Sequence, residues 1–403
     1  MSAAAEAAET MTAQDEASSA EEVSKAGNEE EDDALPRHCH DHTNGCPSSP
    51  VEADRESIGR VVDAFFYYQQ FEKSRLYSRI QSIQLLSREH QALIEPAHSE
   101  HTRRVLECID HNQNVLQEII CYGVQAFGVQ GEQAILSRED RQSSPHFMSK
   151  LASTLKQIAR EWSEEGAAER EQTFEPIIAE LKARFPVDRR SKTKVLLPGT
   201  GLGRLAWDIA DAGFDAMGNE YSIFMLVTSC FILNACSEVN QYTVYPYVMN
   251  SSNSWSYEQQ TRPVRFPDVC PTLTEPTTRD PPMSMSSGDL LQGFEGEDGK
   301  YDVIVTSWFI DTAHNVIEYI ELFHRLLVTG GVWINNGPLT YHYADTPGEL
   351  SLELPYSEVL RIVSLKGFRV ESQRTISNCF YASDSHSMLR HNYSCGFFVA
   401  IKE

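Results

Sequence analysis

The stretch Leu197-Pro198-Gly199-Thr200-Gly201-Leu202-Gly203-Arg204 decides the fold, because three closely spaced glycines separate an apolar run from a helical pattern. Residues 195–197 predict a short buried strand, and the apolar periodicity of residues 202–212 predicts a helix. Glycines between them let the backbone turn sharply and approach a ligand without clashes from Cβ atoms. In dinucleotide-binding loops the third glycine stands five positions after the first, where Arg204 stands here. The spacing therefore predicts a strand–loop–helix site for a different ligand.

From about residue 192 onward, segments typical of strands alternate with segments typical of helices. Strands are predicted near residues 195–197, 214–218, 301–306, 332–335, 368–372 and 396–401, and helices near residues 202–212, 223–235, 316–327 and 358–366. This alternation predicts an α/β domain over residues 191–403 with a doubly wound parallel sheet. Residues 245–285 interrupt it with seven prolines, which predict an inserted loop.

Residues 51–190 predict a helical N-terminal domain, because apolar residues recur there at helical spacing. The predicted buried positions are Ile58, Val61, Val62, Phe65, Phe66, Val105, Ile109, Leu116, Ile119, Leu151, Leu155, Ile158 and Trp162. Residues 1–50 hold twelve Asp and Glu against two Lys and Arg, which predicts a disordered acidic tail. The tail contains His38, Cys39, His40, His42 and Cys46, but no second ligand pair follows at finger-like spacing. We therefore favour a solvated tail and expect no metal site.

The net charge of −24 limits the classes of partner. A protein that follows nucleic-acid phosphates needs a basic surface, and so does one that docks on anionic lipid, so neither partner is expected. Nine cysteines at irregular spacing are typical of reduced thiols. No basic segment followed by an apolar one opens the sequence, so the expected location is the cytoplasm, with the nucleus as a further compartment.

Three later features indicate the ligand of the glycine loop. Glu220 stands at the end of the second predicted strand, where an acid binds ribose hydroxyls. Gly288-Asp289-Leu290 stands before the next core strand, where an acid contacts an adenine amino group, and residues 327–331 are similar to the Leu-Lys-Pro-Gly-Gly turn of class I methyltransferases. The order of these features predicts a Rossmann-like class I methyltransferase domain that binds S-adenosylmethionine. The expected cofactor residues from this domain are Gly199, Gly201, Gly203, Glu220, Asp289, Leu290 and Ser307.

Polar and aromatic residues follow the fourth and fifth core strands, at residues 307–315 and 335–343. The carboxyl ends of parallel strands meet at one sheet edge, so we expect the substrate to bind there. Asp280-Pro281-Pro282-Met283 is similar to the Asp-Pro-Pro-Tyr motif of DNA amino-methyltransferases, but it lies in the insertion and lacks the stacking aromatic residue. Together with the acidic charge, this argues for a small-molecule substrate and against nucleic acid.

Several segments resemble the carnosine N-methyltransferase family over roughly residues 55 to 403. They are residues 198–207, 218–220, 262–263, 266–269, 309–315, 336–339 and 341–342. The resemblance implies methylation of carnosine (β-alanyl-histidine) at the imidazole nitrogen nearer the peptide, which gives anserine. It also implies a homodimer.

The resemblance assigns further residues. Many class I enzymes carry an acid just before the first glycine, where this chain has Leu197-Pro198. The family instead uses a Gln and an Arg three residues apart on the helix before the sheet, which implies cofactor roles for Gln157 and Arg160; the residues alone favour a solvated helix face. The implied catalytic and substrate-binding residues are Asp311, His342 and Tyr393, and His391 stands where the family has a second tyrosine.

The chemistry of imidazole agrees with these assignments. A neutral imidazole has one N–H and one lone pair, so fixing the N–H selects the attacking nitrogen. A carboxylate at Asp311 would accept the distal N–H, and it would stabilise the cationic ring as it forms. Taken without the family, Asp311 is as readily a strand-end cap and His342 an ordinary hydrogen-bonded histidine. Two alternatives stay open: a histidine methyltransferase acting on other peptides or proteins, and a non-catalytic scaffold of the same fold.

Overall fold

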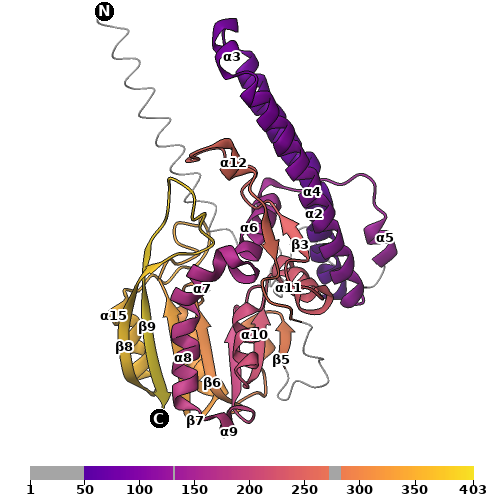
Figure 1. The fold of residues 1–403 in the computed structure, drawn as a ribbon. Helices are drawn as coiled ribbons and strands as arrows, with labels where there is room; N and C mark the ends of the chain where they lie inside the picture. The colour runs from indigo at the N-terminus through magenta and orange to yellow at the C-terminus, as the bar shows by residue number, and fades with distance from the viewer. Residues whose placement is uncertain (1–49, 130–131, 272–282) are drawn as a thin grey trace, which may run out of the picture.

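Long helices form one part of the chain, and a sheet covered by helices forms the other (Figure 1). The computed structural model describes residues 50–129, 132–271 and 283–403, and side chains from Glu56 onward. The predicted acidic tail with its His38–Cys46 cluster, and the Asp280-Pro281-Pro282 motif, lie outside the described residues. Among the described residues, no helix is both long and apolar enough to cross a membrane.

Seven strands form the main sheet, in the order β5-β2-β1-β6-β7-β9-β8. Their bounds are β1 Lys194–Pro198, β2 Asp215–Glu220, β5 Met283–Ser287, β6 Tyr301–Ser307, β7 Leu327–Gly337, β8 Phe368–Cys379 and β9 Tyr393–Lys402. The first five strands in this order run parallel, and β9 lies antiparallel between β7 and β8. The predicted α/β class with a doubly wound, Rossmann-like methyltransferase sheet is confirmed.

Apolar helix faces cover both sides of this sheet (Figure 1). The helices α8 (Glu175–Arg184) and α10 (Arg204–Asp211) bury Ile177, Leu181 and Ile209 against β1, β6 and β7. On the other face lie α13 (Leu290–Gly293), α14 (Val316–Leu326) and α15 (Tyr356–Leu365). Because β1 and β6 are covered on both sides, residues 195–197 and 303–305 are all apolar.

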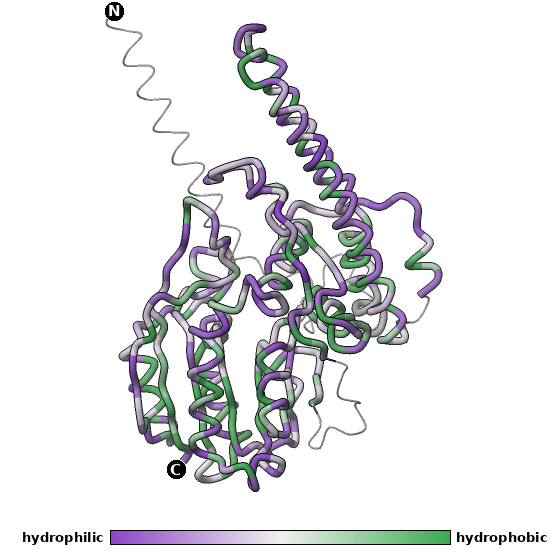
Figure 2. The backbone as a smooth tube through the Cα atoms, in the orientation of Figure 1, coloured by the Kyte–Doolittle hydropathy of each residue, from purple (hydrophilic) through white to green (hydrophobic). Residues whose placement is uncertain are grey.

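Besides α8, the helices before the sheet are α2 Pro50–Gln84, α3 Arg88–Ile94, α4 Ala97–Ala126, α5 Glu132–Leu136, α6 Pro145–Trp162, η1 Glu164–Gly166, α7 Ala167–Thr173 and α9 Val187–Arg190. Of these, α2, α4, α5 and α6 form a core of their own together with α11 (Ile223–Ala235). The predicted apolar positions are buried, except that Ile58 and Phe66 are only partly buried. The pair α2 and α4 extends beyond the body, and its tip carries both hydrophilic and hydrophobic residues (Figure 2).

The segment 245–285 contains more regular structure than the loop that its prolines predict. It includes the short helix α12 (Tyr257–Gln260), β4 (Val264–Phe266), which pairs with β3 (Tyr242–Val244), and the start of β5. The strands were missed because β3 and β4 have three residues each and β5 reads Met-Ser-Met-Ser-Ser, without an apolar run. The edge position of β5 explains that composition.

Candidate active site

The loop between β1 and α10 requires glycine at the positions that the sequence singled out. Gly199, Gly201 and Gly203 have φ angles of +62°, +58° and +83°. A Cβ at Gly199 would lie 2.2 Å from the Phe309 ring, and one at Gly201 would lie 2.7 Å from the Glu161 carboxylate. The bare backbone of the loop therefore passes between two side chains that line it, and it presents its N–H groups at the carboxyl edge of the sheet.

Two acids lie at this edge, as the sequence predicts for a nucleoside site. The Glu220 Oε2 accepts a hydrogen bond from the Gly201 N–H at 2.8 Å, and Oε1 accepts from the N–H groups of Tyr221 and Ser222. The Gly288 N–H donates to the Glu220 carbonyl at 3.0 Å, which holds the next loop beside β2. In that loop Asp289 caps α13, and Leu290 is buried.

Glu161 forms hydrogen bonds with the glycine loop, and the sequence did not predict this role. Its carboxylate is buried and accepts hydrogen bonds from the N–H groups of Leu202 and Arg204, both at 3.3 Å. Burial raises the pKa of this carboxyl, and the Arg160 guanidinium opposes the shift. The Trp162 indole donates to the Leu202 carbonyl at 3.0 Å, so the last turn of α6 is tied directly to the loop.

Gln157 and Arg160 lie on the same helix, close to this junction. The Arg160 guanidinium lies 3.6 Å from the Glu161 carboxylate and 3.5 Å from that of Glu169. Its carbon lies 4.6 Å from the centre of the Tyr381 ring, and the Gln157 amide donates to the Tyr381 hydroxyl at 2.7 Å. Both residues are buried. Gln157 and Arg160 therefore lie buried beside the glycine loop and do not form a solvated helix face.

On the substrate side, Asp311 is fixed by Thr340. Asp311 lies in η2 (Ile310–Thr312) after β6, and only 2% of it is exposed. Its Oδ2 accepts from both the N–H and the hydroxyl of Thr340 at 2.7 Å, and its carbonyl accepts from the His342 N–H at 3.0 Å. The structure therefore brings Asp311 and His342 together, and Thr340, which the sequence reasoning missed, orients the carboxylate.

Aromatic rings form the adjoining wall. Trp308 has a φ of +55°, and its ring lies edge-on to Tyr393 at 5.0 Å and tilted against Tyr381 at 4.8 Å. Burial raises the pKa of Tyr393, and the Asp311 charge adds to the shift. Tyr381 thus joins the cofactor side to the substrate side, although nothing in its local sequence marked it. His391 is exposed, and in the described structure no hydrogen bond or ring contact joins it to this group.

Buried polar atoms without hydrogen-bond partners gather around the glycine loop. Within the described residues they include Gln157 Oε1, Arg160 Nε, Thr200 Oγ1, Ser307 Oγ and Trp308 Nε1. Buried polar groups are satisfied in nearly all native proteins, so such a cluster indicates a polar ligand. Together with the glycine cradle and two acids, these donors and acceptors fit the amino acid and nucleoside ends of S-adenosylmethionine.

Comparison with known proteins decides the family. The sequence profile described as Carnosine N-methyltransferase matches residues 137–403. The chain is 40% identical to Carnosine N-methyltransferase of Mus musculus over 89% of each chain. The chain belongs to the carnosine N-methyltransferase family. It is also 36% identical to Carnosine N-methyltransferase unmet of Drosophila melanogaster, over 87% of this chain and 80% of that one. The Schizosaccharomyces pombe family member is 35% identical, over 87% of this chain and 97% of its own.

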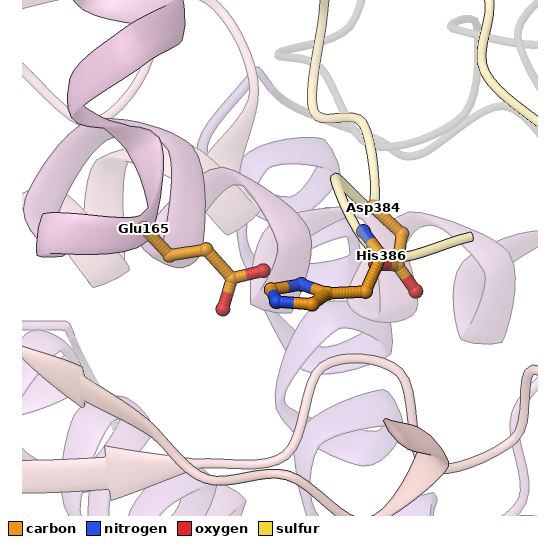
Figure 3. Close-up of side chains that lie close together, drawn as sticks. All are labelled: Glu165, Asp384 and His386. Carbon is orange, nitrogen blue, oxygen red and sulfur yellow. Dashed lines mark hydrogen bonds between the residues drawn. The ribbon is translucent and has the colours of Figure 1, made fainter. Parts of the chain in front are cut away.

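A second cluster of this family member has metal-ligand residue types but a different role. Glu165, Asp384 and His386 face one another in Figure 3, with ligand atoms within 4.8 Å. The Arg262 guanidinium donates to Glu165 at 2.5 Å and to Asp384 at 2.8 Å. Because the Arg262 guanidinium already binds both carboxylates, the cluster is an ion-pair network. It joins Glu165 in η1, Arg262 in the insertion and Asp384 in the loop after β8.

A cavity of about 500 Å³ lies between α2, α4 and residues 251–260, and it shares none of the site residues above. His101 in its wall stacks on Tyr257 at 4.2 Å and bonds Gln260 at 3.0 Å. Burial lowers the pKa of this histidine. The cavity thus lies where residues 251–260 meet α2 and α4.

Proposed function

We propose that this chain methylates the imidazole of carnosine at the nitrogen nearer the peptide, with S-adenosylmethionine as the methyl donor and anserine and S-adenosylhomocysteine as products. The observation that carries the proposal is the Asp311 carboxylate, fixed by Thr340 beside His342 at the carboxyl edge of the sheet. It lies next to the aromatic wall of Trp308 and Tyr393. Family membership supports the substrate class.

The cofactor supplies an electrophilic methyl group, which the cradle residues would hold by its two ends. Glu220 would accept the ribose hydroxyls and Asp289 the adenine amino group, as acids at these strand ends do. Gln157 and Arg160 would bind the methionyl end, since both have buried atoms that lack hydrogen-bond partners among the described residues. Gly199, Gly201 and Gly203 would admit the cofactor against the backbone, and Leu290 and Ser307 would line the site beside it.

The substrate residues would select the attacking nitrogen. Both Thr340 hydrogen bonds go to Oδ2 of Asp311, which leaves Oδ1 to accept the distal ring N–H. The proximal lone pair then forms the new C–N bond, while the electron pair of the broken C–S bond stays on sulfur. The ring becomes cationic, and the adjacent carboxylate stabilises that charge as it appears. Release of the distal proton to solvent gives the neutral product.

One experiment separates this function from its alternatives. Purified protein is incubated with labelled S-adenosylmethionine and a panel of carnosine, other histidine dipeptides, histidine-containing peptides and cell protein. The proposal expects transfer to carnosine at least tenfold faster than to the peptides. Transfer to protein and not to carnosine would support the alternative histidine methyltransferase, and no cofactor binding at all would support the scaffold.

We also propose that the helices before the sheet supply a homodimer surface. Leu85 and Leu93, near the end of the paired helices α2 and α4, are 88% and 78% exposed. Leu86 is also exposed, and exposed apolar patches at one end of a molecule mark protein–protein contacts. Sedimentation analysis should show a dimer, and Leu85→Glu with Leu93→Glu should shift it to the monomer. A monomeric starting protein would rule the dimer out.

A further inference from the structure

The ion-pair network around Arg262 is largely shielded from solvent. The guanidinium donates to Asp384 at 2.8 and 3.3 Å and to Glu165 at 2.5 and 3.4 Å. Only 14% of the Arg262 side chain is exposed, against 19% for Glu165 and 11% for Asp384. Burial by itself would lower the pKa of Arg262, but its hydrogen bonds to the two carboxylates raise it. Charge-assisted bonds with so little exposure contribute more than surface ion pairs, so the network fixes the loop after β8 to the insertion.

The same loop carries Tyr381, three residues before Asp384. Ala382 between them has a φ of +46°, a conformation that disfavours a side chain and persists only where surrounding contacts stabilise it. Two such contacts are present. The Ala382 N–H donates to the Glu169 carboxylate at 3.0 Å, and Arg262 binds Asp384 at the end of the turn.

Tyr381 depends on this turn for its position, because 42% of the residue is exposed. Its hydroxyl accepts from the Gln157 amide at 2.7 Å. Its ring centre lies 4.6 Å from the Arg160 guanidinium carbon and 4.8 Å from the Trp308 ring centre. A ring with so much exposed surface has little packing to fix it, so a shift of the turn would move it away from Gln157 and Arg160 together.

Without the Arg262 charge, the two acids of the network would repel each other. Glu165, Asp384 and His386 face one another in Figure 3, with ligand atoms within 4.8 Å. Carboxylates that are mostly buried and have lost their cation gain free energy by moving into water. Glu165 lies in η1 directly after α6, whereas Asp384 lies in a loop. Asp384 is therefore the acid that would move, and Tyr381 would move with it.

We propose that Arg262 is a positioning residue for the methyl transfer, which acts by fixing Asp384 and thereby keeps Tyr381 in contact with Gln157 and Arg160. The inference rests on the proposed function, in which Gln157 and Arg160 bind the methionyl end of the cofactor. Tyr381 contributes one hydrogen bond and one cation–π contact to the arrangement of these two residues. Each contact is worth a few-fold in affinity, so losing both should weaken S-adenosylmethionine binding roughly tenfold.

A double-mutant cycle on the full chain tests the proposal. Arg262→Met and Arg262→Lys, which keeps the charge, are each made in the wild type and in Tyr381→Ala. Arg184→Met is the matched control, because Arg184 also donates to two carboxylates, those of Glu180 and Glu371. Glu371 lies near the start of β8, at the sheet edge away from the glycine loop. For each protein, calorimetry gives the dissociation constant of S-adenosylmethionine, and the melting temperature shows whether the chain is folded.

The proposal expects Arg262→Met to weaken cofactor binding roughly tenfold in the wild type and less than twofold in Tyr381→Ala, since the ring on which Arg262 acts is then absent. Arg262→Lys should recover part of the loss, and Arg184→Met should bind within twofold of the wild type. The proposal is overturned if folded Arg262→Met binds within twofold of the wild type, or if it loses the same factor in both backgrounds. If Arg262→Met does not fold, Asp384→Asn takes its place in the same cycle, with the same expected results.

Methyl transfer to carnosine, measured on the same proteins, separates this inference from the proposed function. Coupling between Arg262 and Tyr381 in a chain that does not methylate carnosine contradicts the proposed substrate and supports the role of Arg262. Methylation of carnosine without that coupling overturns the role of Arg262 alone. A wild-type chain that binds no S-adenosylmethionine contradicts both.

Discussion

Replacing Asp311 by Asn removes the charge on which the proposed methyl transfer depends while nearly preserving the volume of the side chain. Thr340 donates two hydrogen bonds to Oδ2, so the Asn amide oxygen takes that position and its NH₂ group takes the position of Oδ1. A donor would then face the distal ring N–H instead of an acceptor. Loss of one such preorganised electrostatic contact costs about 2.7–4 kcal/mol in the transition state, so kcat should fall roughly 10²–10³-fold.

The assay is single-turnover methyl transfer to carnosine, with cofactor affinity measured separately by calorimetry. Because Asp311 contacts the substrate side of the site, the dissociation constant of S-adenosylmethionine should stay within about twofold. Thr340→Val is the matched variant, since it keeps the N–H donor and removes only the hydroxyl. It should lower kcat roughly 10–100-fold, less than Asp311→Asn does, in line with one hydrogen bond to a charged group of about 1.5–3 kcal/mol. An Asp311→Asn enzyme that turns over within twofold of the wild type would remove Asp311 from the mechanism.

Four further outcomes are expected. Glu220→Ala should weaken S-adenosylmethionine binding at least tenfold in calorimetry, because a carboxylate that accepts ribose hydroxyls makes charge-assisted hydrogen bonds; unchanged affinity would refute the ribose role. Gly201→Ala and Gly203→Ala both place a Cβ at positive φ, at a cost of about 1–2 kcal/mol each. Only the Cβ at position 201 meets the Glu161 carboxylate, so Gly201→Ala should weaken cofactor binding more than Gly203→Ala does. Equal loss of affinity in both variants would count against the contact with Glu161. Tyr381→Phe removes only the hydroxyl that Gln157 contacts and should weaken cofactor binding less than about tenfold. Tyr381→Ala should weaken cofactor binding more, since it also removes the ring that contacts Arg160 and Trp308. Equal loss of affinity in the two variants would mean that the ring does not contribute. Burial lowers the pKa of His101, so the unfolded chain binds a proton more readily than the folded chain does. The melting temperature should therefore fall as the pH drops below about 6.5. His101→Gln should make this fall shallower, and a variant with the pH profile of the wild type would contradict the role of His101.

The glycine loop shows what local sequence can establish. Its spacing predicted a strand, a turn and a helix, and all three φ angles are positive as the turn requires. The buried strands β1 and β6 were equally clear, because a strand covered on both faces carries a run of apolar residues. The edge strand β5 was missed because it lacks such an apolar run. Its serines are residues that a loop would also carry.

The site was predictable only where its residues lie at strand ends. Asp311 and Glu220 stand directly after β6 and at the end of β2, so topology alone places them at one edge. Glu161 and Tyr381 reach the same edge from a helix and from a loop that lie far away in the chain. Their roles depend on contacts with Leu202 and Gln157 that no local pattern encodes.

The central claim is that this chain methylates one particular nitrogen of a small imidazole substrate. It is tested most directly by mass spectrometry and NMR of the product formed from carnosine and S-adenosylmethionine. The account predicts a single added methyl group, located on the ring nitrogen nearer the peptide, and its loss in Asp311→Asn. A methyl group on the distal nitrogen or on the β-alanyl amine would contradict the assigned orientation of the ring, and so would an unmodified dipeptide.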